Sequence, residues 1–192
     1  MLKHIGAYFL MLRMVFVKPT KANVMYGLIF KEIQDLIIGS LGIVCFLSFF
    51  VGGVVSIQTA LNIDGELIPE SLVGFATRQS IILEFAPTFM AIILAGKVGS
   101  YITSSIGTMR VTEQIDALEV MGINSLNYLI FPKLVAMTLL PIVIIFSMFL
   151  GIFGGWAATI YGGFSSTAAF VEGVQMDFKP FHVFYAFIKT FL

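Results

Sequence analysis

The chain has 192 residues, of which 58% are apolar and 11% charged, and its 11 basic and 11 acidic residues cancel to zero net charge. Soluble domains carry about 25% charged residues, so this composition excludes a soluble globular enzyme, and the lack of a basic excess argues against a nucleic-acid partner. The single cysteine, Cys45, excludes an intrachain disulfide and a cysteine-cluster metal site. The sequence therefore predicts an all-α, polytopic membrane helical bundle.

The first 35 residues precede the long uncharged runs, and they predict two helices. Within Met1–Lys21, apolar residues recur at helical spacing among basic residues, as in a helix that lies in the membrane interface. The apolar positions are Leu2, Ile5, Phe9, Leu12 and Phe16, and the basic ones include Lys3, Arg13, Lys18 and Lys21. No small-residue cleavage site follows a compact apolar core, which excludes a cleavable signal peptide. We interpret residues 1–35 as an interfacial helix and an elbow helix; the alternative for the first is an ordinary amphipathic helix packed on protein.

Long uncharged runs predict the membrane spans. Leu36–Ile63 holds 28 residues without a charge, more than the roughly 20 that cross a bilayer core about 30 Å thick. We expect spans over 36–63, 74–96 and 131–157, then an outer segment over 164–177 and the start of a fourth span over 178–192. The last apolar run, Phe181–Leu192, rises only about 18 Å as a helix, so we expect a further C-terminal part.

Basic residues favour alternate segments, and this predicts the orientation. They precede the first span and recur between the second and third spans, where Lys97, Arg110 and Lys133 lie. The segments Asn62–Thr77 and Gly162–Asp177 hold acidic residues and no basic one. Because positive charge favours cytoplasmic loops, the N-terminus and the loop between the second and third spans are predicted to be cytoplasmic.

The Lys97–Lys133 loop is long for a connector, and residues 100–122 predict an amphipathic helix within it. Gly122 is expected to end this helix in the left-handed conformation, and Pro132 to lie in the first turn of the next helix. Two interpretations remain open, a solvated surface helix or a docking helix for a cytoplasmic partner. The apolar stripe of this helix consists of Val111, Ile115 and Leu118.

Among the polar and helix-breaking residues inside the predicted spans, three carry an interpretation. A charge at membrane depth costs at least about 2.5 kcal/mol on insertion scales, so Glu84 is interpreted as functional, with a structural glutamate that joins helices as the alternative. Pro87 removes a backbone hydrogen bond and favours a kink. Gln58 in the first span is either a ligand-binding residue or a contact between helices.

The sequence contains neither a recognisable nucleotide site nor a metal site. The stretch Ala95-Gly96-Lys97-Val98 lacks the serine or threonine after the lysine and the earlier glycine of a phosphate-binding loop. The histidines, His4 and His182, are isolated from other metal-ligating residues. We therefore expect no catalytic residue, no metal and no cofactor, and any ATP to be bound by a partner subunit.

Three motifs carry a family resemblance. They are Glu84-Phe85-Ala86-Pro87, Ala95-Gly96-Lys97-Val98-Gly99-Ser100 and Ile106-Gly107-Thr108-Met109-Arg110-Val111-Thr112-Glu113-Gln114-Ile115-Asp116-Ala117-Leu118. In order and spacing they resemble the MlaE permease family, whose pattern is a glutamate, a small residue and proline, then A-G-R-x-G-S, then I-G-x-M-[RK]-[VA]-T-E-Q-[IL]-x-[AS]-[LM]. Lys97 and Lys133 replace family arginines. Leu83 stands where some members have an arginine, so a salt bridge to the adjacent glutamate has no local counterpart here.

The resemblance implies the membrane subunit of an ABC transporter that moves phospholipid between the two membranes of a diderm bacterium. Such subunits are homodimers in the inner membrane that bind cytoplasmic ABC ATPase subunits and a periplasmic MCE-domain protein. The lipid-binding residues it implies are Val55, Gln58, Asn62, Ile63, Glu84 and Pro87. The ATPase-coupling residues it implies are Arg110, Thr112, Glu113, Gln114, Asp116, Leu118 and Glu119. The alternative function is a non-transporting membrane scaffold or a membrane-embedded lipid enzyme.

Overall fold

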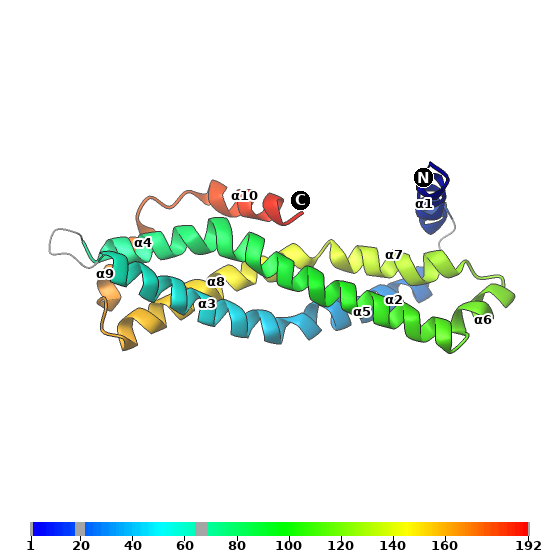
Figure 1. Ribbon diagram of the computed structural model, residues 1–192, viewed down its shortest axis with the longest axis horizontal. Helices are drawn as coiled ribbons and strands as arrows, with labels where there is room; N and C mark the ends of the chain where they lie inside the picture. The colour runs from blue at the N-terminus through cyan, green and yellow to red at the C-terminus, as the bar shows by residue number, and fades with distance from the viewer. Residues whose placement is uncertain (1, 18–21, 64–68, 192) are drawn as a thin grey trace. The chain divides into compact units, whose positions relative to one another are not determined.

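The computed structural model describes residues 2–17, 22–63 and 69–191, and these residues form helices joined by short turns, without a strand (Figure 1). The first helices are α1 (Leu2–Val17), α2 (Ala22–Ile33), the π-helical segment η1 (Gln34–Ile38), α3 (Gly39–Ile63) and α4 (Ser71–Ser80). They are followed by the π-helical segment η2 (Ile81–Met90), α5 (Ala91–Val111), α6 (Gln114–Val120), α7 (Ser125–Met137), α8 (Leu140–Tyr161), α9 (Thr167–Gln175) and α10 (Pro180–Phe191).

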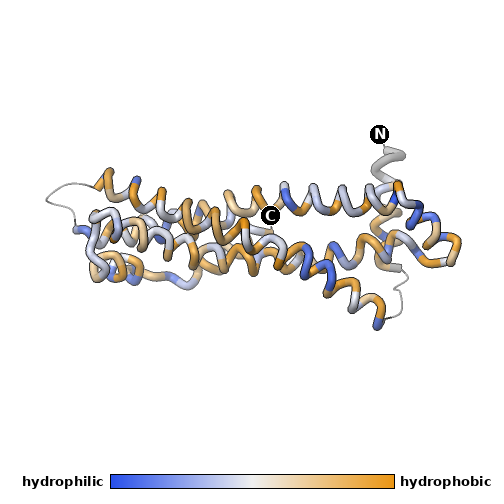
Figure 2. The backbone as a smooth tube through the Cα atoms, turned by 90° about the horizontal axis from the view of Figure 1, so that it is seen from below, coloured by the Kyte–Doolittle hydropathy of each residue, from blue (hydrophilic) through white to orange (hydrophobic). Residues whose placement is uncertain are grey.

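Three helical stretches among the described residues are long and apolar enough to cross a membrane: Asn23–Ile63, Ser71–Val111 and Ser125–Tyr161. Figure 2 shows apolar residues following one another along these stretches. Each of the first two has 41 residues, and a helix of that length rises about 60 Å, about twice the thickness of the hydrocarbon core. The predicted all-α membrane bundle is thereby confirmed. The α10 helix, with 12 residues, is much shorter than a span.

The helix that contains the third predicted span begins before that span. Instead of beginning at 131, the helix begins with α7 at Ser125, so Pro132 lies inside this helix and not in its first turn. The physical cause is a side-chain cap, because Asn124 Oδ1 accepts the amides of Leu126 at 3.2 Å and Asn127 at 3.3 Å. A side chain that accepts hydrogen bonds from the first free amides of a helix favours a helix start at its own position.

The helix predicted over 100–122 is interrupted in the structure. The α5 helix ends at Val111, and Glu113, with a left-handed φ of 56°, separates it from the short helix α6. Arg110 and Asp116 form an ion pair of 3.1 Å across this break. Gly122 has a φ of 71°, the left-handed conformation predicted for it, and ends the turn after α6.

The chain divides into two compact units. Unit 1 comprises residues 1–40 and 96–140, which include α1, α2, η1, most of α5, α6 and α7. Unit 2 comprises residues 41–95 and 141–192, which include most of α3, α4, η2, most of α8, α9 and α10.

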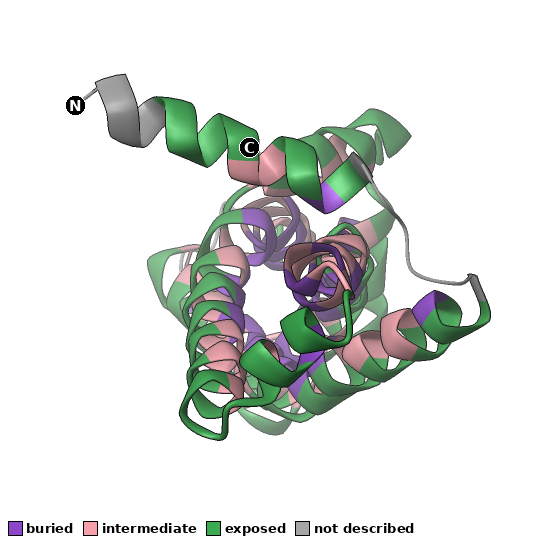
Figure 3. Cartoon of the chain, turned by 90° about the vertical axis from the view of Figure 1, so that its right-hand side faces the viewer, coloured by how far each residue is buried: buried purple, intermediate pink, exposed green. Residues whose placement is uncertain are grey.

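In unit 1, α1 is attached to α7 through its C-terminal end. Val15 is fully buried, and its carbonyl oxygen accepts a hydrogen bond from Asn127 Nδ2. Asn124 Nδ2 donates to the carbonyl oxygen of Met14 at 3.0 Å, and the rings of Phe16 and Phe131 meet edge to face. Most other described side chains of α1 are exposed (Figure 3). Packing on protein therefore anchors one end of this helix, and its position in the membrane interface stays a prediction.

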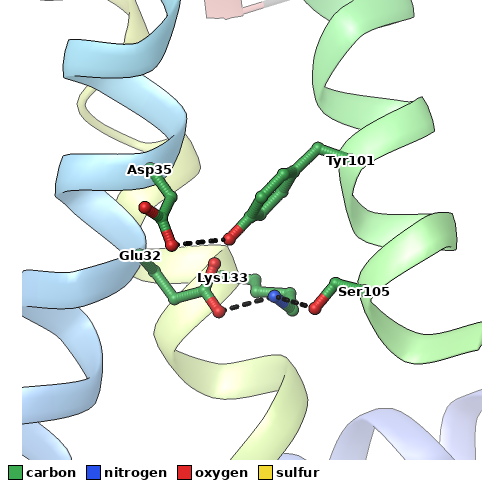
Figure 4. A network of polar contacts seen from close by, with 5 residues as sticks. All are labelled: Glu32, Asp35, Tyr101, Ser105 and Lys133. Atoms are coloured by element: carbon green, nitrogen blue, oxygen red, sulfur yellow. Dashed lines mark hydrogen bonds and ion pairs between the residues drawn. The ribbon is translucent and has the colours of Figure 1, made fainter. Parts of the chain in front are cut away.

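A polar network joins α2, η1, α5 and α7 inside unit 1 (Figure 4). Lys133 Nζ lies 2.5 Å from Glu32 Oε1 and 3.2 Å from Ser105 Oγ, and its side chain is only 4% exposed. Beside it, the hydroxyl of Tyr101 donates to Asp35 Oδ2 at 2.9 Å. The network lies next to an apolar core formed by Leu36, Val98 and Ala136. Four helical segments thus share one set of polar contacts.

In unit 2, α3 and α8 pack through glycines at backbone distance. A Cβ atom on Gly52 would lie 1.8 Å from the carbonyl oxygen of Gly151, and one on Gly154 would lie 2.1 Å from that of Phe49. The α4 and α9 helices approach in the same way, because a Cβ on Gly173 would lie 1.8 Å from the carbonyl oxygen of Ser71. Small residues allow such contact between helices in a membrane.

We predict that Gly52→Ala destabilises the protein, whereas Gly42→Ala on the same helix does not. The added methyl group at 52 would overlap the backbone of α8, and overpacking of this kind costs about 1–3 kcal/mol or more. A Cβ at Gly42 meets nothing within 4 Å, and alanine favours the helix by up to about 1 kcal/mol. Thermal unfolding of the purified proteins in detergent measures both. Equal melting temperatures for the two variants would contradict the close α3–α8 contact.

We predict that Lys133→Met lowers the free energy of unfolding by up to about 3 kcal/mol. This value is at the low end for a broken buried pair, because the side chain of Glu32 keeps 18% of its surface exposed. The control is Lys31→Met, which replaces an exposed lysine on α2, and surface changes stay within about 0.5 kcal/mol. Chemical unfolding in detergent compares them. A Lys133→Met protein as stable as its control would show that the network contributes nothing.

Candidate functional site

A cavity of about 420 Å³ lies in unit 2 between α3 and η2. Its size falls within the range of about 300–1,000 Å³ that small-molecule pockets occupy, and such pockets are mostly apolar with few polar groups. The hydroxyl of Thr59 is already bonded to the carbonyl oxygen of Val55 at 2.7 Å, so the exposed amide of Gln58 is the polar group that the wall can offer a ligand. The lining consists of Phe50, Val51, Val54, Val55, Gln58, Thr59, Phe85 and Phe89.

The structure brings together two of the six residues predicted to bind lipid. Val55 and Gln58 line this cavity. Asn62 lies one turn further along α3, where its Nδ2 donates to the carbonyl oxygen of Gln58 at 2.7 Å, and Ile63 ends the helix. The other two predicted residues, Glu84 and Pro87, are on η2 outside the lining. The proposed lipid role of the whole set stays a prediction.

Glu84 points away from the protein interior, with 69% of its side chain exposed. Its Oε2 atom lies 3.1 Å from Nζ of Lys189 on α10, and the same Nζ donates to the carbonyl oxygen of Leu83 at 3.0 Å. The sequence predicted no local cation for this glutamate, and the structure supplies one from a distant helix. An apolar run that contains a single charge was the available signal, because a charge within a span needs a partner.

The helix around Glu84 is irregular. Residues Ile81–Met90 are π-helical, and Pro87 lies within this segment. Proline cannot donate a backbone hydrogen bond and clashes with the preceding turn, which explains why regular α-helical bonding is lost here. Short π-helical segments occur frequently at functional sites, and η2 contributes both Phe85 and Phe89 to the cavity wall.

Arg78 is a second charged residue of unit 2 whose role the sequence did not reveal. Its side chain is 1% exposed, and its Nη1 donates to the carbonyl oxygens of Val174 at 2.8 Å and Met176 at 2.9 Å. Its guanidinium group also lies over the rings of Phe75 and Phe178. A cation bound to the last carbonyls of α9 satisfies that helix end and joins it to α4. The signal was a lone arginine inside the predicted span 74–96.

An exposed segment connects two of the long helices in unit 1. Val111 ends α5, α6 follows, and Val120 is 88% exposed. Of the seven predicted coupling residues, only Leu118 is buried. The Glu119 carboxylate accepts a hydrogen bond from Ser125 Oγ at 3.1 Å, which ties α6 to the start of α7. The exposed members are Arg110, Thr112, Glu113, Gln114, Asp116 and Glu119. This segment presents apolar and acidic side chains together.

No group of three or more histidine, cysteine, aspartate or glutamate side chains that could hold a metal ion occurs within the described parts of the chain. The glutamates with located partners bind a lysine or a serine, and none of these contacts pairs two carboxylates.

Comparison with known proteins agrees with these features. Residues 29–192 match the family model described as Permease MlaE. A "Probable ABC transporter permease protein" of Rickettsia bellii is 29% identical over 86% of this chain and 64% of its own length. A protein of the same description from Synechocystis is 34% identical over 79% of this chain and 57% of its own length. The chain thus spans less than two thirds of the length of these relatives.

The family model covers more than half of the chain, including the apolar stretches, η2 and the exposed α6 segment. Its relatives are described as permeases, which are the membrane subunits of ABC transporters. This chain is a multi-pass membrane protein that belongs to the MlaE permease family.

Proposed function

We propose that this chain is the permease subunit of an ABC transporter that moves phospholipid between the inner and outer membranes. It has no ATP site of its own and couples ATP hydrolysis in a partner subunit to a lipid pocket between two copies of the permease. Family membership implies the ATPase partner. The phospholipid, the homodimer and a periplasmic MCE-domain partner are parts of the proposal.

The observation that carries the proposal is the cavity between α3 and η2. Its wall is made of phenylalanine and valine side chains with one exposed amide at Gln58. Such a wall suits acyl chains, which need apolar contact, with a polar group near the headgroup. Its exposed rim includes Phe50, Val54 and Phe89, so a second copy of the chain could complete the enclosure.

The exposed segment around α6 would receive the movement of the ATPase. It lies between two long apolar helices, and its tip carries exposed Val111, Val120 and Met121. Docking surfaces combine such apolar contacts with a polar rim. The Arg110–Asp116 ion pair and the Glu119–Ser125 hydrogen bond would preserve the conformation of the segment while the ATPase moves it. A rigid shift of this segment could then open or narrow the cavity.

A non-transporting scaffold or a membrane-embedded lipid enzyme is the competing function. Within the described residues of unit 2, Arg78 donates to two carbonyl oxygens and Glu84 pairs with a single lysine. These contacts stabilise helices and do not assemble a general acid with a general base. The apolar cavity therefore favours transport over catalysis.

We predict that the complex purified from membranes contains an ATPase subunit and phospholipid in intact-mass spectra, and that Glu113→Lys combined with Val120→Lys removes the ATPase. Both residues are exposed. A reversed charge at 113 and a new charge on the apolar position 120 should weaken docking, and each roughly 1.4 kcal/mol lost lowers affinity tenfold. Glu172→Lys, an exposed change on α9, is the control. A lipid-free chain without an ATPase would favour the scaffold, and wild-type ATPase content in the double variant would refute the docking site.

We predict a cytoplasmic α6 segment and a periplasmic α9 on the basis of the charge asymmetry. Single cysteines at Val111 and Glu172, in a chain with Cys45→Ala, are treated with a membrane-impermeant maleimide after the outer membrane is permeabilised. Both positions are exposed, so access depends on the side of the membrane. Label is expected at 172 and not at 111, and the reverse pattern would invert the orientation. Residues 64–68 of the other predicted periplasmic loop lie outside the described residues.

A further inference from the structure

The only lysine of α10 makes two polar contacts with the π-helical segment of the second long helix. Lys189 Nζ lies 3.1 Å from Glu84 Oε2 and 3.0 Å from the carbonyl oxygen of Leu83. The lysine side chain is 29% exposed, less than half the exposure of its glutamate partner. Both residues belong to unit 2, and α10 packs along η2.

We propose that Lys189 is the positioning residue of Glu84. Its ammonium group fixes the direction in which that carboxylate points. Glu84 is the only charged residue of η2, and a carboxylate at such a depth is stable when a cation lies beside it. The effect on transport rests on the lipid role proposed for Glu84, whereas the pairing itself does not.

Pro87 explains why the ammonium group has a second acceptor in this place. In a regular α-helix, the amide of residue 87 would donate to the carbonyl of residue 83, and proline has no N–H to do so. Lys189 Nζ donates to that carbonyl. One segment, η2, carries Pro87, the carbonyl of Leu83 and the carboxylate of Glu84. The lysine is therefore bound at one defined position on this helix.

The second ion pair near α10 differs in the exposure of its lysine, since Lys189 is 29% exposed. Lys179 and Asp177 approach to 3.3 Å, but their side chains are 61% and 64% exposed, and exposed pairs contribute little in water. Lys179 precedes α10, makes no polar contact with η2 within the described residues, and serves as a matched control.

The test is a double-mutant cycle on the complete complex, with Glu84→Gln, Lys189→Met and both together. Melting temperature in detergent and phospholipid transfer between reconstituted vesicles are both measured. We expect Lys189→Met to lower transfer by about tenfold, Lys189→Arg to keep most of it, and Lys179→Met to leave it unchanged. The charge swap Glu84→Lys with Lys189→Glu should recover part of the loss, because it restores opposite charges.

The two measurements separate this inference from the proposed function. Non-additive melting temperatures in the cycle support the pair, and additive ones overturn it even if transfer falls. Equal transfer by the Lys189→Met and Lys189→Arg proteins overturns the positioning role. If the wild-type complex transfers no phospholipid, the proposed function fails, and the melting-temperature cycle still decides whether Lys189 pairs with Glu84. If Lys189→Met does not fold, the Lys189→Arg and charge-swap proteins decide whether Lys189 positions Glu84. Phospholipid transfer by both supports the positioning role, and loss of transfer in both overturns it.

Discussion

Charged side chains on apolar helices must find a partner on another helix, and this requirement organises the structure. Lys133 binds Glu32, Arg78 binds the carbonyls that end α9, and Lys189 binds Glu84. Hydrocarbon offers no water to solvate an unpaired charge or backbone group. Each pair therefore restricts which helices can be neighbours, although the residues involved are far apart in the sequence.

The two units bring their helices together through different kinds of contact. Unit 1 joins its helices through side chains, in the network of Glu32, Ser105 and Lys133 with Tyr101 and Asp35 alongside. Unit 2 brings α3 to α8 and α4 to α9 through glycines at backbone distance. Helices in a membrane gain little from hydrophobic association, since lipid is equally apolar, so close packing and polar contacts provide the stability. The long-range contacts of Arg78 and Lys189 in unit 2 then add specificity to a glycine-based contact.

Properties that depend on local pattern could be predicted from the sequence. Uncharged runs predicted a helical membrane protein, and Gly122 predicted a left-handed turn. The motifs around Glu84 and Thr112 indicated the family. Properties that depend on tertiary contacts could not be predicted from the sequence. The left-handed backbone at Glu113 accompanies an ion pair across the turn, and a single sequence does not show that Lys189 meets Glu84 across 105 positions. In the cavity, only Val55 and Gln58 come from the predicted set, because neighbouring positions on η2 face different directions.

The η2 segment links the ion pair to the cavity by covalent geometry. Glu84 binds α10, while the next residue, Phe85, forms part of the cavity wall. Since adjacent residues of a helix move together when the helix rotates, a shift of α10 that pulled on Glu84 would also turn Phe85 and Phe89 relative to Gln58 on α3. A segment already released from regular α-helical bonding by Pro87 resists such a rotation less than an uninterrupted helix would. The irregular backbone is thus the place in unit 2 where a change at the ion pair would reach the cavity wall most directly.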